Sequence, residues 1–109
     1  MAWLLRGGDV LASVNVATSA IDRFRATAGL EHADGVLWCE GSRVAHSIGS
    51  RCSLDVAYLN DERVVLAVTS LHPLRIGRPR PGAAAVVEGR AGAFVHWDLR
   101  PGDQLEIRE

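Results

Sequence analysis

The middle of the chain, residues 44–68, constrains the fold most, because turn-forming residues interrupt its apolar runs at short intervals. Residues 44–48, 54–59 and 64–69 carry the β-branched and aromatic side chains that favour strands. The segments between them are rich in Gly, Ser, Asn and Asp, which favour chain reversals. The sequence therefore predicts three antiparallel strands, and the second and third of them are apolar on both faces.

One helix is predicted ahead of this region, between residues 19 and 29. Ser19 is followed three residues later by Asp22, which resembles the capping box found at helix starts. Gly29 supplies a C-terminal stop, because glycine adopts the left-handed conformation in which many helices end. These signals bound the helix on both sides.

The spacing of its apolar residues predicts how this helix is oriented. Ile21 and Phe24 lie three residues apart, so they share a face that is expected to pack on the core. Arg23 and Arg25 fall on other faces and are expected to point away from it. The helix is thus predicted to be amphipathic with its apolar side inward.

Short extended runs and a second brief helix occupy the rest of the chain. The helix is expected within residues 91–99, because Phe94 and Trp97 lie three residues apart. Residues 72–82 hold three of the four prolines, so this segment is predicted to be the longest irregular loop. The remaining predicted strands are residues 3–6, 10–16, 36–39, 83–87 and 104–107.

Short strands every 8 to 12 residues or so, with one or two brief helices, are typical of a compact β-rich domain. We therefore expect one domain spanning residues 1–109, mainly β (α+β) in class. Its antiparallel sheet is expected to form a barrel-like or sandwich core. Such an arrangement buries the two-sided strands and leaves few exposed edges.

Charge and hydropathy restrict the partners of such a domain. Its formal net charge of −1 argues against a nucleic-acid-binding protein, because such proteins usually display a net basic face. The apolar patch within residues 1–8 is too short for a secretory signal, and no apolar run approaches the roughly 20 residues of a membrane helix. A soluble, cytoplasmic protein with no membrane partner and no cofactor is expected, and its oligomeric state stays open.

The two cysteines are predicted to be thiols. Cys39 and Cys52 form no CxxC pair and have no histidines at metal-ligand spacing. The hairpin interpretation places them at opposite ends of one strand, farther apart than the roughly 7 Å that a disulfide allows between Cα atoms. A structural role is therefore expected for both.

Two motifs in the second half of the chain resemble those of a known family. Residues 53–60 form SLDVAYLN, and residues 99–105 form LRPGDQL. They resemble the motifs P-L-D-[IV]-A-[FW]-L-D and L-x-x-G-D-x-[IVL] of the domain of unknown function 192 family (uncharacterised protein family 0127). That family places a helix and an apolar strand before the first motif, as residues 19–39 do here. The resemblance spans roughly residues 19–107 and implies a β-rich fold and a site region, but no reaction.

The main candidate site lies near the predicted reversal between residues 48 and 54. Its residues are His46, Arg51 and Asp55. One strand register brings the His46 imidazole and the Asp55 carboxylate together, whereas a slip of one residue puts them on opposite faces. If they meet, the carboxylate raises the pKa of the imidazole and the pair could act as a general base or metal ligand. The alternative is that Asp55 satisfies turn amides and His46 is a core histidine that holds it.

Other catalytic arrangements lack a supporting motif. No nucleophile elbow surrounds Ser47, Ser50 or Cys52 beside His46. The histidines have neither HxH nor HxxxH spacing, which argues against a metal site. They are His32, His46, His72 and His96.

Two further groups are candidates for ligand contact. Arg75, Arg78 and Arg80 on the proline-rich loop could clamp a phosphate, a carboxylate or an acidic partner, because guanidinium matches those geometries. The alternative is a solvated loop. Trp38 could line an apolar cleft, or it could fill the core of a small domain.

The sequence therefore favours a small non-enzymatic ligand-binding or interaction module for an unknown small molecule or acidic partner. Its candidate site comprises His46, Arg51 and Asp55, with Trp38, Arg75 and Arg78 as further candidates. The alternative is a small hydrolase-like or metal-assisted enzyme that uses His46 and Asp55.

Overall fold

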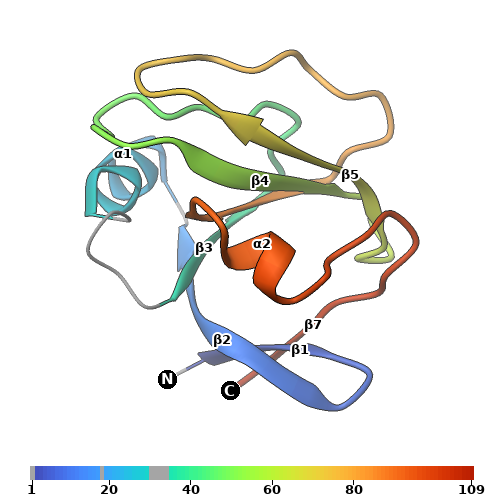
Figure 1. Cartoon of the computed structure of the whole chain (residues 1–109). Coiled ribbons are helices and arrows are strands. Elements are labelled where there is room, and N and C mark those ends of the chain that lie inside the picture. Colours follow the sequence, from blue (N-terminus) through green and yellow to red (C-terminus); the bar gives the residue numbers. More distant parts are fainter. Residues whose placement is uncertain (1, 18, 30–34) are drawn as a thin grey trace.

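The computed structural model describes residues 2–17, 19–29 and 35–109, which form a seven-stranded sheet and two short helices (Figure 1). The strands lie side by side in the order β5-β4-β6-β3-β2-β1-β7. The mainly β class with brief helices is confirmed. In chain order the elements are β1 (Ala2–Arg6), β2 (Asp9–Ala17), α1 (Ala20–Gly29), β3 (Val36–Glu40), β4 (Leu54–Leu59), β5 (Val65–Leu71), β6 (Ala85–Arg90), α2 (Ala93–His96) and β7 (Glu106–Arg108).

The sheet is mixed and does not close into a barrel. β2 and β3 pair in parallel and α1 connects them, whereas the other neighbouring strands pair antiparallel. Between the edge strands β5 and β7 the described residues form no ladder; the segments just before the two strands meet at an isolated bridge between Val64 and Gln104 and at a few neighbouring backbone hydrogen bonds. The expected barrel-like closure is therefore wrong, because a short local contact stands where closure requires a continuous ladder between the edge strands.

The first hairpin forms where glycine allows it. Gly7 and Gly8 connect β1 to β2 with φ values of 59° and 88°. Two consecutive residues with positive φ are the signature of the two-residue turns that match strand twist, and glycine adopts them without steric cost. β1 also pairs with β7, so the two ends of the chain lie side by side (Figure 1).

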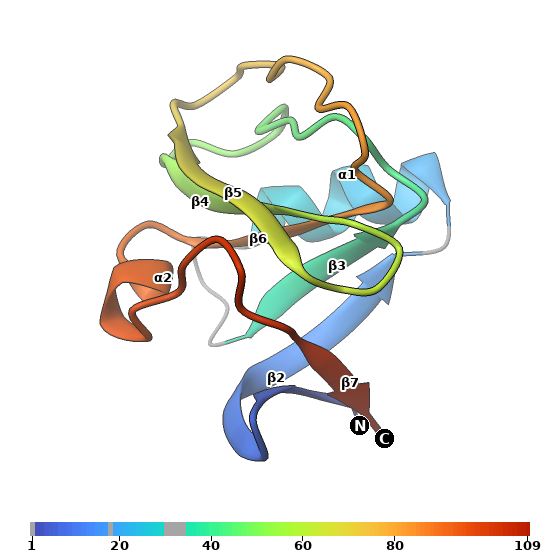
Figure 2. The same cartoon turned by 90° about the vertical axis from the view of Figure 1, so that its right-hand side faces the viewer.

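The two faces of the sheet carry separate cores, because successive side chains of a strand point to opposite faces. The face toward α2, called the α2 face below, includes Ala57 and Leu59 of β4 packed with Phe94. The face toward α1, called the α1 face, includes Val56 and Tyr58 of the same strand. Figure 2 shows the two helices on different sides of β6. All six residues of β4 are buried, as its two-sided apolar pattern predicted.

The expected strand at residues 44–48 is absent, which corrects the three-strand interpretation of the middle region. This segment is a loop whose backbone pairs with the 72–82 loop through an isolated bridge between His46 and Ile76. The amide of Ser47 donates to the Arg75 carbonyl at 2.9 Å. Pro73, Pro79 and Pro81 lack the N–H groups of a continuous ladder, so the pairing stays local.

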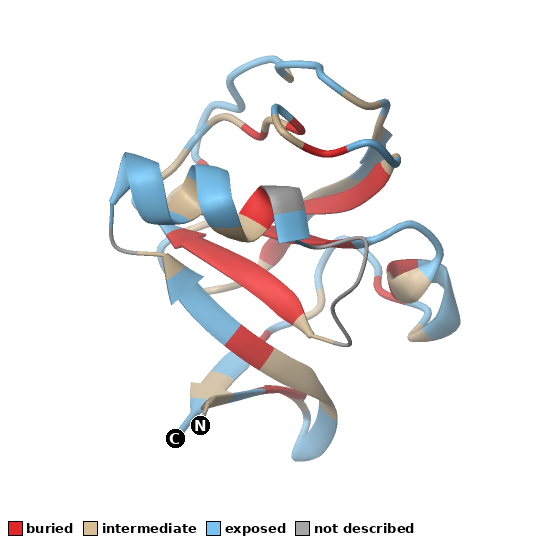
Figure 3. Ribbon diagram, turned by 90° about the vertical axis from the view of Figure 1, so that its left-hand side faces the viewer, coloured by how far each residue is buried: buried red, intermediate tan, exposed pale blue. Residues whose placement is uncertain are grey.

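The bounds of α1 match the prediction, but its orientation does not. Ser19 Oγ accepts the Asp22 amide at 3.1 Å, as expected of the cap. Ile21 and Phe24 are 64% and 48% exposed, whereas the Arg23 side chain is only 16% exposed. Figure 3 shows the helix lying across the buried strand β3 with its outer side exposed. The sheet beneath the helix carries the Glu88 carboxylate, which pairs with Arg23. The charged side of the helix therefore faces the sheet, and its apolar side chains face outward.

Some expectations fall outside the described residues. Of the turn predicted at residues 32–35, only residue 35 is described, and His32 therefore lies outside the described residues. In the part of the chain that the structure describes, no helix is both long and apolar enough to cross a bilayer.

Candidate functional site

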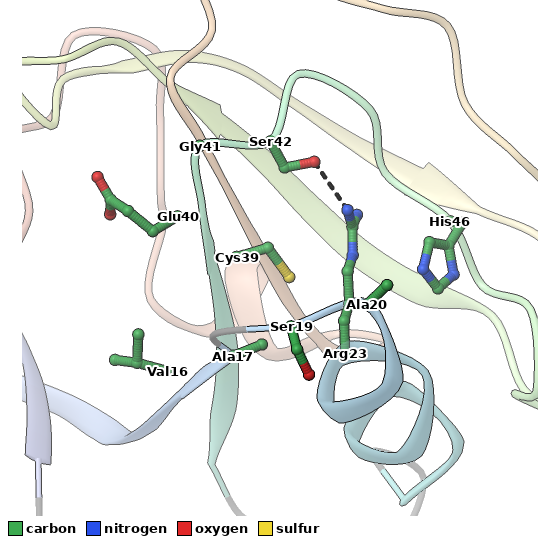
Figure 4. Close-up of a pocket in the computed structure, with 10 residues that line it drawn as sticks. All are labelled: Val16, Ala17, Ser19, Ala20, Arg23, Cys39, Glu40, Gly41, Ser42 and His46. Carbon is green, nitrogen blue, oxygen red and sulfur yellow. Dashed lines mark hydrogen bonds between the residues drawn. The ribbon is translucent and has the colours of Figure 1, made fainter.

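An open cleft of about 740 Å³ lies where β2 and β3 end and α1 begins (Figure 4). Because the two strands are parallel and α1 connects them, their carboxyl ends meet the start of the helix at this edge. Such junctions are common positions for ligand sites beside parallel strands. The lining residues are Val16, Ala17, Ser19, Ala20, Arg23, Cys39, Glu40, Gly41, Ser42 and His46.

Arg23 extends from α1 along one wall of this cleft (Figure 4). Its guanidinium donates to Ser42 Oγ at 2.7 Å and to the Val44 carbonyl at 2.6 Å. It also forms an ion pair with Glu88, whose Oε2 lies 3.5 Å from Nη2. The arginine thus joins the helix, the loop after β3 and the sheet.

Glu88 of β6 is fully buried on the α1 face. Oε1 accepts the Thr27 hydroxyl at 2.9 Å, and Oε2 accepts the backbone N–H of His46 at 3.3 Å. Burial raises the pKa of this carboxyl above its usual value, and the charge of Arg23 together with the hydrogen bonds opposes the rise. A buried ionisable group with a raised pKa beside a cleft is a common feature of functional sites.

His46 lies at the same cleft, with its imidazole on the side of Arg23 (Figure 4). Burial lowers the pKa of the imidazole, and the nearby charge of Arg23 lowers it further. The neutral ring is therefore the main form at pH 7. Within the described residues, His46 Nδ1 and Arg23 Nε are buried without a hydrogen-bond partner. Such unsatisfied atoms are rare in folded proteins.

Cys39 lines the cleft as a neutral thiol. Burial raises its pKa to about 12, with a smaller contribution from Glu88. A protonated thiol is a poor nucleophile, so this residue contributes apolar surface to the cleft. Neither Cys39 nor Cys52 forms a disulfide, as predicted, although Cys52 precedes β4 and is not on the same strand as Cys39.

Asp55 lies on the other face of the sheet and fastens α2. Its Oδ2 accepts the amides of Gly92 at 2.9 Å and of Phe94 at 3.0 Å. Gly92 has a φ of 93°, which permits the turn that aims both amides at the carboxylate. The interpretation that Asp55 satisfies turn amides is confirmed.

His46 and Asp55 lie on opposite faces of the sheet. Val56 of β4 lies opposite Glu88 of β6, and Asp55 lies opposite Gly89. Because faces alternate along each strand, the Asp55 carboxylate lies on the α2 face, whereas the His46 amide binds Glu88 on the α1 face. Neither of the two registers that the sequence left open is adopted, because residues 44–48 form a loop that does not pair with β4, and these side chains lie apart on opposite faces.

The other predicted site residues are dispersed. Trp38 is fully buried in the core of the α2 face, and its indole N–H donates to Glu40. Arg51 is exposed in the turn before β4. Arg75 and Arg78 are exposed on the 72–82 loop, away from the cleft lining.

No metal centre is apparent among the described residues, since no three of their His, Cys, Asp and Glu side chains form a group that could hold an ion. His72 and His96 are exposed on separate loops or helices. His32 lies outside the described residues.

The sequence interpretation found His46 but missed Arg23 and Glu88. Helical spacing predicts an outward Arg23, because it predicts that the apolar residues Ile21 and Phe24 face the core. One signal was available, since Glu88 interrupts the apolar run of β6, and a charge inside a buried strand usually has a partner. Local sequence does not reveal which arginine is that partner, because Arg23 and Glu88 are 65 positions apart in the chain.

Comparison with known proteins adds a family match. The model of DUF192, described as an uncharacterized ACR, matches residues 5–107. A UPF0127 protein of Pyrococcus abyssi (strain GE5 / Orsay) is 39% identical over 54 residues, which cover 50% of this chain and 46% of that protein. A UPF0127 protein of Pyrococcus furiosus is 34% identical over 61 residues, covering 56% and 53% respectively. The matched part of the chain thus spans about half the length of these relatives.

Two solved structures have a similar fold. A protein of Sinorhizobium meliloti 1021, described as a putative transcription regulator, aligns with a TM-score of 0.75 at 20% identity over 96% of this chain and 90% of that one. A protein of unknown function from Novosphingobium aromaticivorans DSM 12444 aligns with a TM-score of 0.69 at 16% identity over 96% and 82%. At these identities the likeness concerns the fold alone.

Proposed function

The chain belongs to the DUF192 family of uncharacterised proteins, and on this premise we propose that it is a small ligand-binding module whose site is the cleft beside α1. This places the site on the α1 face, at His46, and leaves Asp55 to the structure of the opposite face. The proposal keeps the binding class expected from the sequence and moves the position of the site.

The Arg23–Glu88 ion pair beside an open cleft is the observation that supports this proposal most strongly. Burying two charges costs roughly several kcal/mol of desolvation free energy. A protein with a well-packed apolar pair in place of a buried ion pair is often equally stable. A purely structural helix contact would therefore be served by apolar side chains, and Ile21 and Phe24 are available on the same helix but point outward. The charged contact is better explained by a binding role at the cleft that Arg23 lines.

The lining of the cleft suggests the chemistry of the ligand. Val16, Ala17, Ala20 and the neutral Cys39 thiol provide an apolar surface. A proton on His46 Nδ1 would meet no acceptor and would lie near the Arg23 cation, so the neutral ring is expected to carry its proton on Nε2. A small molecule with an apolar body and a head group that accepts hydrogen bonds fits this surface.

The enzyme alternative based on His46 and Asp55 has no supporting geometry, because the two side chains lie on opposite faces and Asp55 Oδ2 is occupied by two amides. The thiol and hydroxyl nearest the cleft offer no activated nucleophile, since Cys39 is protonated and Ser42 Oγ accepts from Arg23. The binding proposal requires neither.

Nuclear magnetic resonance with two matched probes tests the proposal. Hexanamide or hexanoate, added to the ¹⁵N-labelled protein, is expected to shift the amide signals of Ala20, Ser42 and His46. The variant Ala20→Phe fills the cleft and should abolish these shifts. Ala91→Phe places the same ring at an exposed position outside the cleft lining and should preserve them.

Two results would contradict the proposal: no saturable shift with either probe, or shifts that persist unchanged in Ala20→Phe. Loss of the shifts in Ala91→Phe would indicate a general effect of the added ring and would also count against a site at the cleft.

A further inference from the structure

Two loops at one end of the molecule carry arginines but no acidic residue. Residues 41–53 and 72–84, together called the loop end below, hold five arginines and neither Asp nor Glu. All 13 acidic residues of the chain lie elsewhere, although its formal net charge is −1. The five arginines are Arg43, Arg51, Arg75, Arg78 and Arg80.

The two loops form one continuous structure at the upper end of the molecule in Figure 1. The Gly77 amide donates to the Ala45 carbonyl at 2.8 Å, and the Arg80 amide donates to the Arg43 carbonyl at 3.1 Å. Prolines restrict the segment around residues 78–81. The arginines are thus carried by a braced surface rather than by independent loops.

These arginines have no acidic partner on the described part of the chain. The ion pairs found there use Arg6, Arg23, Arg100 and Arg108. The Arg80 guanidinium instead lies 5.1 Å from the centre of the Tyr58 ring. Together with Arg78 it lines a cleft of about 450 Å³ that also exposes Thr69 and Ser70. Guanidinium and hydroxyl donors at one cleft match the oxygen atoms of a phosphate group.

Large apolar side chains on the same two loops are exposed as well. Leu74 and Ile76 are 69% and 67% exposed, and Ile48 is 38% exposed. Leu74 also has a φ of 58°, a left-handed conformation that is unfavourable for a bulky residue. Neither burial nor backbone conformation therefore accounts for leucine at this position.

We propose that the loop end docks on the surface of an anionic phospholipid bilayer. Unpaired arginines would bind the phosphate groups, with Arg78 and Arg80 at the cleft, while Leu74 and Ile76 enter the boundary between headgroups and acyl chains. A bilayer offers anionic and apolar chemistry side by side over a broad area. Nucleic acid would satisfy the arginines but not the exposed leucine and isoleucine. Surface docking needs no spanning helix and does not depend on the cleft beside α1.

Vesicle co-sedimentation of the full chain tests this proposal. We expect binding to vesicles of 70% phosphatidylcholine and 30% phosphatidylglycerol, little binding to pure phosphatidylcholine, and a decrease with added salt. Each surface arginine contributes about a fivefold change in partitioning. The double variant Arg75→Gln/Arg78→Gln should therefore bind about 25-fold more weakly.

Leu74→Gly separates docking from folding. Glycine adopts the left-handed conformation freely, so the melting temperature should stay the same or rise, while vesicle binding falls. Two control variants should bind vesicles like the wild type: Val95→Ser, which changes an 83% exposed apolar residue on α2, and Arg90→Gln, which changes an exposed arginine at the end of β6.

The proposal is overturned if the wild type binds neither vesicle, or binds both equally. It is also overturned if Leu74→Gly and the double arginine variant bind as tightly as the wild type. Preferential binding of the loop end to polyglutamate or to duplex DNA, with no binding to vesicles, would assign this surface to a different partner.

Discussion

Two buried carboxylates lie in neighbouring positions of the sheet but on opposite faces, and they differ in what satisfies them. Asp55, on the α2 face, accepts two backbone amides from one turn. Glu88, on the α1 face, accepts from two side chains and one amide that come from the helix and a loop. One carboxylate is bound by the main chain of the fold itself, and the other by groups around a cleft.

The difference separates a structural role from a candidate functional one. A turn that donates two amides to a carboxylate can do little but fix the turn, and no cleft residue is involved. The groups around Glu88 include Arg23 and His46, which both line the 740 Å³ cleft. Asp55 therefore stabilises the α2 face, whereas the groups around Glu88 are the ones on which the proposed binding site depends.

The largest effect is expected on the α1 face, from Arg23→Met. This change leaves Glu88 buried without its cation, and we expect the free energy of unfolding to fall by about 3 kcal/mol. Urea unfolding measures it. Replacing both partners, in Arg23→Met/Glu88→Leu, should recover most of the loss, because no unpaired charge remains. A double variant less stable than Arg23→Met would contradict the ion-pair explanation.

The next largest effect is expected on the α2 face, from Asp55→Ala. Two amides lose their acceptor, one of them in the buried Phe94, so the free energy of unfolding should decrease by about 2 kcal/mol. Asp55→Asn retains an oxygen acceptor and should lose less. Neither variant should alter the probe-induced shifts at the cleft, and a change there would break the separation of the two faces.

A smaller effect is expected from His46 as the pH changes. Its pKa is lowered in the folded state, so between that value and the ordinary 6.5 the unfolded chain binds more protons. The stability contributed by His46 is therefore complete above pH 6.5 and is lost as the pH falls. Glu88 has the opposite effect, because its pKa is raised in the folded state. Its contribution to stability decreases as the pH rises above the ordinary pKa of a carboxyl group.

Comparing wild type with His46→Gln isolates the histidine contribution. The difference between their unfolding free energies, measured by urea titration at several pH values, should increase with pH and level off near 6.5. A difference that stays flat over this range would show that the ring titrates as it does in the unfolded chain.

The smallest effect is expected from thiol labelling, which tests how tightly the α1 face is closed without any mutation in the core. Cys52 is exposed, whereas Cys39 is buried beside Glu88 with a pKa of about 12. With DTNB at pH 8 one thiol should react at once and the second only on unfolding. Cys52→Ser should remove the fast phase. A rapid reaction of Cys39 in that variant would mean that the α1 face opens readily.

Much of the fold was predictable, because strong local signals determine it. The Ser19 cap and Gly29 bound α1, the apolar run of β4 is buried throughout, and prolines keep residues 72–82 irregular. The family resemblance was confirmed by the match over residues 5–107. The prediction failed at residues 44–48, where a β-like composition forms a loop that pairs with another loop.

The candidate site was predicted only in part. His46 lies at the cleft because its segment is a loop whose backbone binds Glu88 on the α1 face, whereas the alternation along β4 puts Asp55 on the α2 face. The inward position of Arg23 was not predictable from helical spacing, since Ile21 and Phe24 are the more apolar residues of α1. It depends on Glu88, which lies 65 positions along the chain from Arg23.

Outside residues 44–48, the sequence by itself largely determined where the chain extends, turns and coils, since backbone preference depends on neighbouring residues. Only the tertiary structure decided which strands became neighbours, that β2 and β3 run parallel, and that two carboxylates received different partners. The physical reason is that pairing and burial join residues far apart in the chain. Their energies depend on the partner that each group meets, and local composition does not specify that partner.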